Sequence, residues 1–295
     1  GSLTEVTGRH SREIAMIVAQ DAAVDATVTF TIHRPERLAY QMAEMGGDED
    51  APEYHAWYAD HPVTIRDGRP VADSFTLDRH GFVLLNSPTA VPDFYDADHF
   101  AAIYDPEIEA LVKQQTGAAE VVVFDHTIRV QSDDKRREKK VRETVKLAHN
   151  DYTEKSGPQR VRDILGDREE AERRLAKRYA FFNLWRPIAG PVLSVPLALC
   201  EADSVRPEDW VVAELVYTDR VGEIYNLAWS EGQRWWYFPR MTTDEILLFK
   251  CFDSARDGRS RFTPHSAFDD PTTPADAPPR ESIETRVVAF FDETA

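Results

Sequence analysis

The sequence has few cysteines, an excess of negative over positive charge, and no long apolar run. The two cysteines, Cys200 and Cys251, are too few for a disulfide scaffold or a four-cysteine zinc site. Asp and Glu outnumber Lys and Arg by 52 to 35, and the net charge of −17 argues against nucleic-acid or anionic-membrane binding. No apolar stretch approaches the roughly 18 residues that a membrane span needs. We therefore expect neither nucleic acid nor membrane as a partner.

The composition is that of a folded globular protein. Hydrophobic residues make up 42% of the 295 residues and aromatic residues 11%, which excludes a disordered chain. The N-terminus shows no basic-then-apolar signal pattern, so we predict a soluble protein of the cytoplasm. The nine histidines could support metal binding or acid–base chemistry, which the two cysteines alone could not.

Closely spaced strand patterns dominate the chain from residue 119 onward. Runs rich in β-branched and aromatic residues predict strands at 121–130, 143–148, 179–185, 195–200, 210–216, 223–230, 234–239, 246–252, 261–268 and 282–291. A charged turn is expected at 133–140. Helices are expected only near 156–178, where Asp167 and Glu170 have the spacing of a capping box. Such strands without alternating helices indicate an antiparallel sandwich or barrel.

The first 118 residues combine strand and helix patterns. Strands are predicted at 26–33 and 81–85, and a loop at 42–53. A helix should begin near Asp105 and Pro106, with Asp105 as its cap, and end at Gly117. We predict one domain over 1–295, in which a helix-containing portion, 1–118, packs on a core formed by 119–295. The fold class is mainly β with flanking helices.

His149, Asn150 and Asp151 form the first candidate metal-binding motif. A histidine and a carboxylate two positions apart at a strand end point to the same face and can bind one metal ion. A surface turn is the alternative, since Asn and Asp favour turns. His265 is the only histidine after Asp151, and it lies in a late strand pattern. Two histidines and one carboxylate are the ligand set of non-haem Fe(II) oxygenases. We therefore predict that His149, Asp151 and His265 bind iron.

Arg280 and Ser282 stand where the last predicted strand begins. A guanidinium can hold a carboxylate through two hydrogen bonds, and a hydroxyl can add a third. Three ligands leave three metal positions open, enough for a 2-oxo acid and O₂. We predict that Arg280, with Ser282, holds the far carboxylate of 2-oxoglutarate. Arg286 is the competing candidate.

Several stretches resemble the AsaB-type hydroxylase/desaturase family, which is related to cephalosporin 7α-methoxylase components. They are FDHTIR, AHNDYT, NLWRPIAGPV, PLALCEADS, WWYFPRMTTDEILLFKCFDS and RFTPHSAFDDPTTPADAPPRESIETR, and they cover about residues 120–291. The resemblance implies a double-stranded β-helix (jelly-roll) core, Fe(II), 2-oxoglutarate and O₂. It also implies that a C–H bond of a small specialised metabolite is oxidised by hydroxylation, desaturation or ring closure. His149, Asp151 and His265 carry over as metal ligands.

Further residues are weaker candidates for ligand contacts. Tyr217 and Tyr225 could hydrogen-bond 2-oxoglutarate. Asn183, Trp185 and Arg186 could face the substrate, whereas sheet packing and a surface ion pair are the alternatives. His126 is expected to be packed or hydrogen-bonded in a sheet.

Two other functions stay open at this stage. One is a cupin-like metal enzyme that uses the triad without 2-oxoglutarate. The other is a non-catalytic β-scaffold that binds a ligand. A carboxylate on the substrate and a homodimer are further possibilities.

Overall fold

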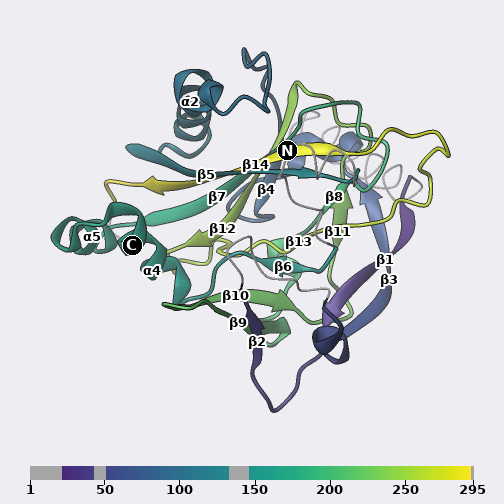
Figure 1. The fold of residues 1–295 in the computed structure, drawn as a ribbon, viewed down its shortest axis with the longest axis horizontal. Helices are drawn as coiled ribbons and strands as arrows, with labels where there is room; N and C mark the ends of the chain where they lie inside the picture. Colours follow the sequence, from purple (N-terminus) through teal and green to yellow (C-terminus); the bar gives the residue numbers. More distant parts are fainter. Residues whose placement is uncertain (1–21, 43–50, 133–145, 294–295) are drawn as a thin grey trace, which may run out of the picture.

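The computed structural model describes residues 22–42, 51–132 and 146–293. Within them, two β-sheets face each other across a buried core (Figure 1). The larger sheet has the strand order β1-β3-β11-β8-β13-β6-β10-β9-β2, and the smaller has the order β4-β12-β7-β14-β5. This arrangement is a jelly roll with flanking helices, as the sequence predicts.

The strands of the larger sheet are β1 (Val24–Thr31), β2 (Leu38–Gln41), β3 (Tyr58–Asp67), β6 (His149–Asn150), β8 (Leu197–Cys200), β9 (Trp210–Val216), β10 (Val221–Leu227), β11 (Trp235–Tyr237) and β13 (His265–Ala267). Those of the smaller sheet are β4 (Phe82–Asn86), β5 (Glu120–Val130), β7 (Tyr179–Pro187), β12 (Glu245–Asp253) and β14 (Glu281–Phe290). The helices are α2 (Asp105–Thr116), α4 (Ser156–Leu165) and α5 (Arg168–Leu175), with short turns η1 (Pro52–Trp57), η2 (Arg69–Ser74), η3 (Phe100–Tyr104), η4 (Ala202–Ser204) and η5 (Pro207–Asp209).

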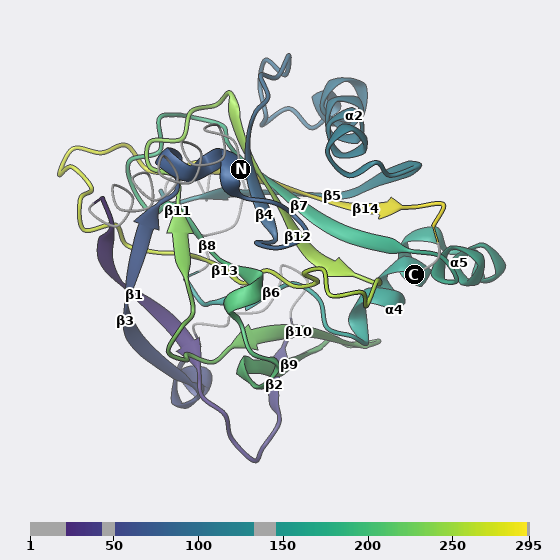
Figure 2. The same ribbon diagram turned by 180° about the vertical axis from the view of Figure 1, so that it is seen from behind.

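The smaller sheet has two different faces. Its outer face is mostly apolar and is covered by α2, whose Ile108 and Val112 pack among Leu184, Leu248 and Val287 (Figures 1 and 2). Its inner face looks toward the larger sheet and carries polar as well as aromatic residues. Because side chains alternate along a strand, successive side chains of β14 point to the inner and the outer face in turn.

Most predicted elements are present within a few residues of their expected ends. Helix α2 ends at Gly117, whose φ of 74° is the left-handed conformation that glycine tolerates. Asp167 caps α5 by accepting a hydrogen bond from the Glu170 amide at 2.8 Å. The expectation that Asp105 caps its helix is wrong. A π-helical turn, η3, precedes it, and the Asp105 carboxylate instead contacts the His126 ring at 2.7 Å.

The N-terminal portion contributes more strand than its sequence predicts. Strands β1, β2 and β3 belong to the larger sheet and β4 to the smaller, so the first 118 residues form part of both layers. Strands β2 and β3 were not predicted, because β3 carries Pro62 and several charged residues that disfavour a strand pattern. Residues 43–50 of the predicted loop, the turn expected at 133–140 and residues 143–145 of the strand expected at 143–148 lie outside the described residues. In the remainder of that strand, Leu147 forms only an isolated bridge to Thr29.

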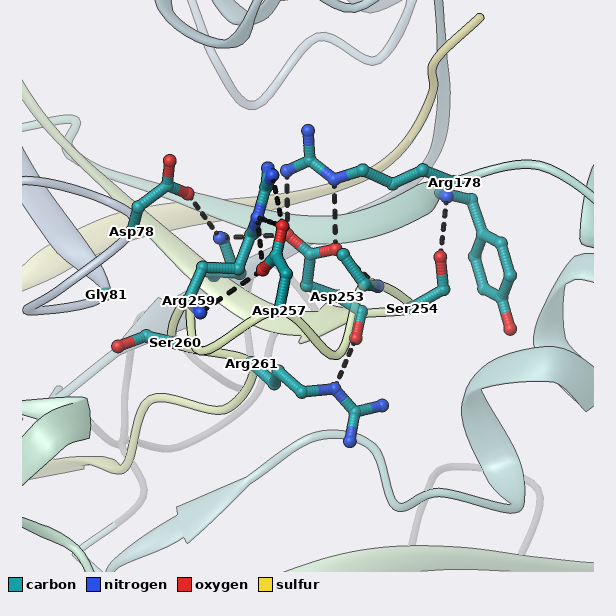
Figure 3. Close-up of polar contacts among 12 residues, drawn as sticks. Asp78, Gly81, Arg178, Asp253, Ser254, Asp257, Arg259, Ser260 and Arg261 are labelled. Carbon is teal, nitrogen blue, oxygen red and sulfur yellow. Dashed lines mark hydrogen bonds and ion pairs between the residues drawn. The ribbon is translucent and has the colours of Figure 1, made fainter. Parts of the chain in front are cut away.

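A buried ion network fixes the loop between β12 and β13. Asp253 accepts hydrogen bonds from Arg178 at 3.1 and 2.8 Å, and its second oxygen lies 2.9 Å from the Lys250 amine. Arg261, farther along the loop, donates to the Asp253 carbonyl at 2.6 Å (Figure 3). The loop ends at β13, whose first residue is His265.

Across the described residues, none of the helices has the length and apolar character needed to cross a membrane.

Candidate metal centre

His149 and His265 are neighbours in the middle of the larger sheet. They form the register pair that joins β6 to β13, and Asp151 follows β6 directly. Asp151 Oδ1 lies 3.4 Å from His149 Nε2 and 3.5 Å from His265 Nε2. The three ligand atoms all fall within 4.8 Å of one another. This spacing suits one metal ion bound by two imidazoles and one carboxylate oxygen.

Backbone carbonyls hold both imidazole rings. His149 Nδ1 donates to the Leu147 carbonyl at 2.7 Å, and His265 Nδ1 donates to the Thr263 carbonyl at 3.1 Å. A carbonyl can only accept, so these bonds place the ring proton on Nδ1 and leave Nε2 as the donor atom for a metal. Both rings are therefore oriented before any metal binds.

Asn150 ties the two ligand-bearing segments together. Its amide donates to the Tyr152 and Cys251 carbonyls, both at 2.9 Å, and its Oδ1 accepts from the Thr263 amide at 3.3 Å. Asn150 is fully buried. The residue between His149 and Asp151 thus anchors the segment that precedes His265. Nothing in the local sequence pattern indicates this role.

The charges of the centre shift its pKa values in opposite directions. Burial lowers the pKa of His149, but the hydrogen bond and charge of Asp151 outweigh it, and the net shift is upward. Burial raises the pKa of Asp151, but the charge of Arg286 and the hydrogen bonds from both histidines hold it well below its usual range. Asp151 is thus an anion at neutral pH, as a metal ligand must be.

A cavity lies beside the two histidines. It is lined by Arg129, His149, Trp185, Leu197, His265, Ser266, Ala267, Arg280 and Glu284. Arg280 is 3% exposed, its guanidinium lies 5.3 Å from the centre of the Trp185 ring, and its Nη1 donates to the Val195 carbonyl at 2.6 Å. Its Nε has no hydrogen-bond partner among the described residues. Burial, with the nearby charge of Arg129, lowers the pKa of Arg280 to about 9. This guanidinium is a buried cation at a cavity wall that suits an anion.

Arg286 is engaged elsewhere. Its Nε donates to Asp151 Oδ2 at 2.9 Å, and its Nη atoms contact Asp125 and Glu284, each at 2.6 Å. Asn183 donates to the same Asp151 oxygen at 2.8 Å. These two residues therefore contact the carboxylate of the candidate ligand Asp151 rather than an open space.

Comparisons with known proteins agree with this geometry. A family model described as an oxidoreductase/YMDC permease-like domain matches residues 28–290. A Fe(II)/2-oxoglutarate-dependent dioxygenase of Aspergillus novofumigatus, nvfI, is 34% identical over 266 residues, covering 86% of this chain and 91% of that protein. The hydroxylase/desaturase efuI of Hormonema carpetanum is 32% identical over 259 residues, covering 80% of this chain and 85% of that protein. The chain belongs to this family of Fe(II)/2-oxoglutarate-dependent dioxygenases and hydroxylase/desaturases.

A solved structure supports the assignment. The iron and alpha-ketoglutarate-dependent endoperoxidase NvfI superposes with a TM-score of 0.79 at 28% identity, covering 92% of this chain and 99% of that one. The protein is therefore an enzyme of this type, with Fe(II) as cofactor and 2-oxoglutarate and O₂ as co-substrates, and it acts on a small molecule. The resemblance seen in the sequence is confirmed.

The weaker candidates for ligand contacts in this dioxygenase lie either at or near the cavity or away from it. Trp185 lines the cavity, and Ser282, 1% exposed, lies on the same strand face as Glu284. Arg186 lies on the outer face of β7 and contacts the Tyr104 hydroxyl and the Thr243 carbonyl. Neither predicted tyrosine is among the residues of the described structure that line the cavity.

Those two tyrosines have other neighbours. Tyr225 stacks on Trp210 with ring centres 5.1 Å apart. Tyr217 lies beside Arg220 at the tip of the β9–β10 hairpin.

Arg129 and Glu284 line the cavity but were not predicted as site residues. Two strands carry a sequence pattern that could have identified them. On β14, Ser282, Glu284 and Arg286 alternate with apolar or outward residues, and on β5, Asp125, Thr127 and Arg129 do the same. The two series are paired in register: Arg129 with Ser282, Thr127 with Glu284, and Asp125 with Arg286. Polar residues at every second position of buried strands indicate a polar face inside a barrel.

Proposed function

We propose that His149, Asp151 and His265 hold Fe(II), and that Arg280, assisted by Ser282, holds the far carboxylate of 2-oxoglutarate in the adjoining cavity. The observation that carries this proposal is the state of Arg280. It is buried at a cavity shared with both histidines and has no carboxylate partner among the described side chains. A buried cation is stable only when paired, so an anionic ligand is the expected occupant.

The residues present fit both groups. Two imidazole nitrogens and one carboxylate oxygen converge, which suits Fe(II) with three open positions. The orphaned Nε of Arg280 supplies an unused donor for a carboxylate. The wall also carries Arg129 and Glu284, so charged side chains of both signs line the cavity. Arg286 is not the tail-binding residue in this proposal, because three carboxylates already occupy its guanidinium.

The chain's own residues orient the reactants and exclude water. The two backbone-held imidazoles present Nε2 to the metal, and Trp185 supports Arg280 from one side. With iron and 2-oxoglutarate bound, the centre oxidises a C–H bond of a small substrate and releases succinate and CO₂. Hydroxylation, desaturation and ring closure all begin with removal of hydrogen from carbon, and they differ in how the substrate is then held.

We also propose that the substrate bears a carboxylate. Arg129 lines the same cavity and adds a positive charge near its wall. A guanidinium at a cavity wall can hold a carboxylate through charge-assisted hydrogen bonds, which supports an acidic substrate. Location in the cytoplasm and assembly into a homodimer stay predictions.

The test is anaerobic binding of 2-oxoglutarate to the Fe(II)-loaded enzyme, measured by calorimetry, with succinate release measured separately. Arg280→Gln should weaken 2-oxoglutarate binding by about 10- to 150-fold, because charge-assisted hydrogen bonds contribute roughly 1.5–3 kcal/mol. Arg178→Gln serves as the matched control, since it removes a buried arginine from the β12–β13 loop network. Wild-type affinity in Arg280→Gln would contradict the assignment. A substrate panel of amino acids, peptides and polyketide-like acids in the succinate assay then identifies the substrate class.

A further inference from the structure

We infer that Arg286 and Asn183 are positioning residues that hold Asp151 so that a single carboxylate oxygen, Oδ1, faces the metal. This inference rests on the proposed role of the triad. It concerns how the carboxylate is presented, which the identity of the three ligands does not determine.

The two oxygens of Asp151 have different surroundings. Oδ1 faces both imidazoles, at 3.4 Å from His149 and 3.5 Å from His265. Oδ2 accepts hydrogen bonds from Asn183 Nδ2 at 2.8 Å and from Arg286 Nε at 2.9 Å. Two donors therefore occupy one oxygen, and the other is left for the metal.

The sheet register places both donors. Arg286 on β14 pairs with Asn183 on β7 and with Asp125 on β5, so the three side chains form one row across the inner face. The row meets Asp151, which comes from the opposite sheet. The contact thus spans the core between the two sheets, and a shift of one residue in β14 would turn Arg286 to the outer face.

Arg286 is itself fixed at every nitrogen. Nε contacts Asp151, Nη1 contacts Asp125 at 2.6 Å, and Nη2 contacts Glu284 at 2.6 Å. A planar guanidinium held by three carboxylates cannot rotate without breaking several bonds. Lysine has a single ammonium group at its end and cannot reproduce this geometry.

Asn183 donates to Asp151 in an orientation that leaves its own side-chain carbonyl oxygen without a hydrogen bond among the described residues. The side chain is fully buried, and within the described chain its Oδ1 has no hydrogen-bond partner. Turning the amide over would place Oδ1 against a carboxylate oxygen, so only the observed orientation donates to Asp151. An unpaired buried carbonyl is unfavourable, and its presence here is explained by the donor that it leaves for Asp151.

The consequence concerns the number of open metal positions. A carboxylate that binds through both oxygens would take one of the positions that 2-oxoglutarate and O₂ need. With Oδ2 occupied by Arg286 and Asn183, Asp151 contributes one oxygen, and three positions stay open. Partners that orient metal ligands in this way contribute about 10- to 100-fold to metal affinity.

The experiment measures metal binding without turnover. Mn(II) affinity is determined by electron paramagnetic resonance of free Mn(II), and the visible absorption of the Co(II)-loaded protein reports the coordination number. Arg286→Gln and Asn183→Leu should each weaken Mn(II) binding about 10- to 100-fold and alter the Co(II) spectrum. Arg286→Lys should not restore either property. It also serves as the second variant should Arg286→Gln fail to fold.

Two controls separate the possible results. Lys250→Met removes a buried charge from the outer face of β12 and should lower the melting temperature while leaving Mn(II) affinity and the Co(II) spectrum unchanged. His149→Ala should abolish Mn(II) binding. Wild-type affinity and spectrum in both Arg286→Gln and Asn183→Leu would overturn the positioning role while the triad stands. Equal Mn(II) binding by wild type and His149→Ala would overturn the proposed metal centre, and the positioning role with it.

Discussion

Two buried ion networks lie in the same molecule and are built differently. In the network of the β12–β13 loop, Arg178 contacts both Asp253 and Glu293, and Lys250 contacts both Asp78 and Asp253. Each cation there has two carboxylates. At the metal centre, Arg286 is equally well paired, but Arg280 has no carboxylate partner in the described part of the chain.

The difference separates structural charges from functional ones. Ion pairs in a protein interior are tolerated when every charge is satisfied by its neighbours. The loop network meets that condition within the chain. The cavity meets it only when an anion enters, so part of its charge balance must come from a ligand. A buried charge left unsatisfied beside a cavity is therefore a better guide to a binding site than a dense set of ion pairs.

The loop network should respond most strongly to the loss of one partner. Asp253→Ala leaves Arg178 and Lys250 with one carboxylate each, and we expect a loss of about 3–5 kcal/mol in the free energy of unfolding. Urea denaturation of the metal-free protein measures this loss. A change below about 1 kcal/mol would mean that this network is not a structural element.

Arg280 should behave in the opposite way. Replacing it by methionine removes an unpaired buried cation, so the ligand-free protein should be as stable as wild type or more stable by up to about 4 kcal/mol. The variant should also lose the stabilisation by 2-oxoglutarate, which is about 2.7 kcal/mol at 100 times the dissociation constant. Melting curves with and without the ligand measure both effects. Strong destabilisation of the ligand-free variant would contradict the comparison.

The two networks should also differ in their response to pH. The pKa of His149 is raised above its ordinary value of 6.5, so protons begin to compete with the metal at a higher pH than usual. Below the raised pKa, metal affinity should fall about tenfold per pH unit. Burial raises the pKa of Asp253, but Arg178 and Lys250 outweigh it and the net shift is downward. Its stabilisation is therefore present above the unfolded pKa and lost only as pH falls through the lower folded value.

Calorimetric Mn(II) titrations between pH 5 and pH 8 measure the first effect, and urea denaturation over the same range measures the second. Over that range the loss of stability caused by Asp253→Ala should stay constant, because the folded and unfolded pKa values of Asp253 both lie below it, whereas the metal affinity should change. Metal affinity that is independent of pH would show that His149 does not have to lose a proton.

The smallest effect is expected at the exposed end of the loop. Arg256 contacts Glu154 at 2.6 Å, but its side chain is 68% exposed. Arg256→Ala should change the free energy of unfolding by less than about 1 kcal/mol, because solvent screens such pairs. The same denaturation assay measures it, and a larger loss would show that exposure does not distinguish these pairs from the buried ones.

The sequence predicts the candidate metal ligands because few residues of the required types are available. One histidine follows Asp151, so the triad has a single completion, and the structure brings those three residues together. The sequence also predicts that Arg280 directly precedes the last strand, and in the structure it does so and lines the cavity. The strands of the core were predicted from their β-branched and aromatic runs, for which local pattern and environment agree.

The remaining residues depend on pairings that are distant in sequence. Asn183 acquires its role because β7 lies beside β14, and Asn150 because its side chain reaches Thr263, 113 positions away. Strand β3 was missed because tertiary pairing with β1 outweighs the weak strand pattern around Pro62. Such contacts follow from strand order, which the local pattern of one sequence does not specify.

The shortness of β6 and β13 has a consequence for the larger sheet. These strands have two and three residues and join through the single register pair His265 and His149, yet they lie between β8 on one side and β10 on the other. A metal bound by both histidines would add a second connection between β6 and β13, which are otherwise joined by that one register pair. Loading with metal should therefore slow amide exchange at Leu199 and Asn226, the neighbours on each side of that pair. The metal ion would then have a structural role as well, because it would link the two parts of the larger sheet that meet at β6 and β13.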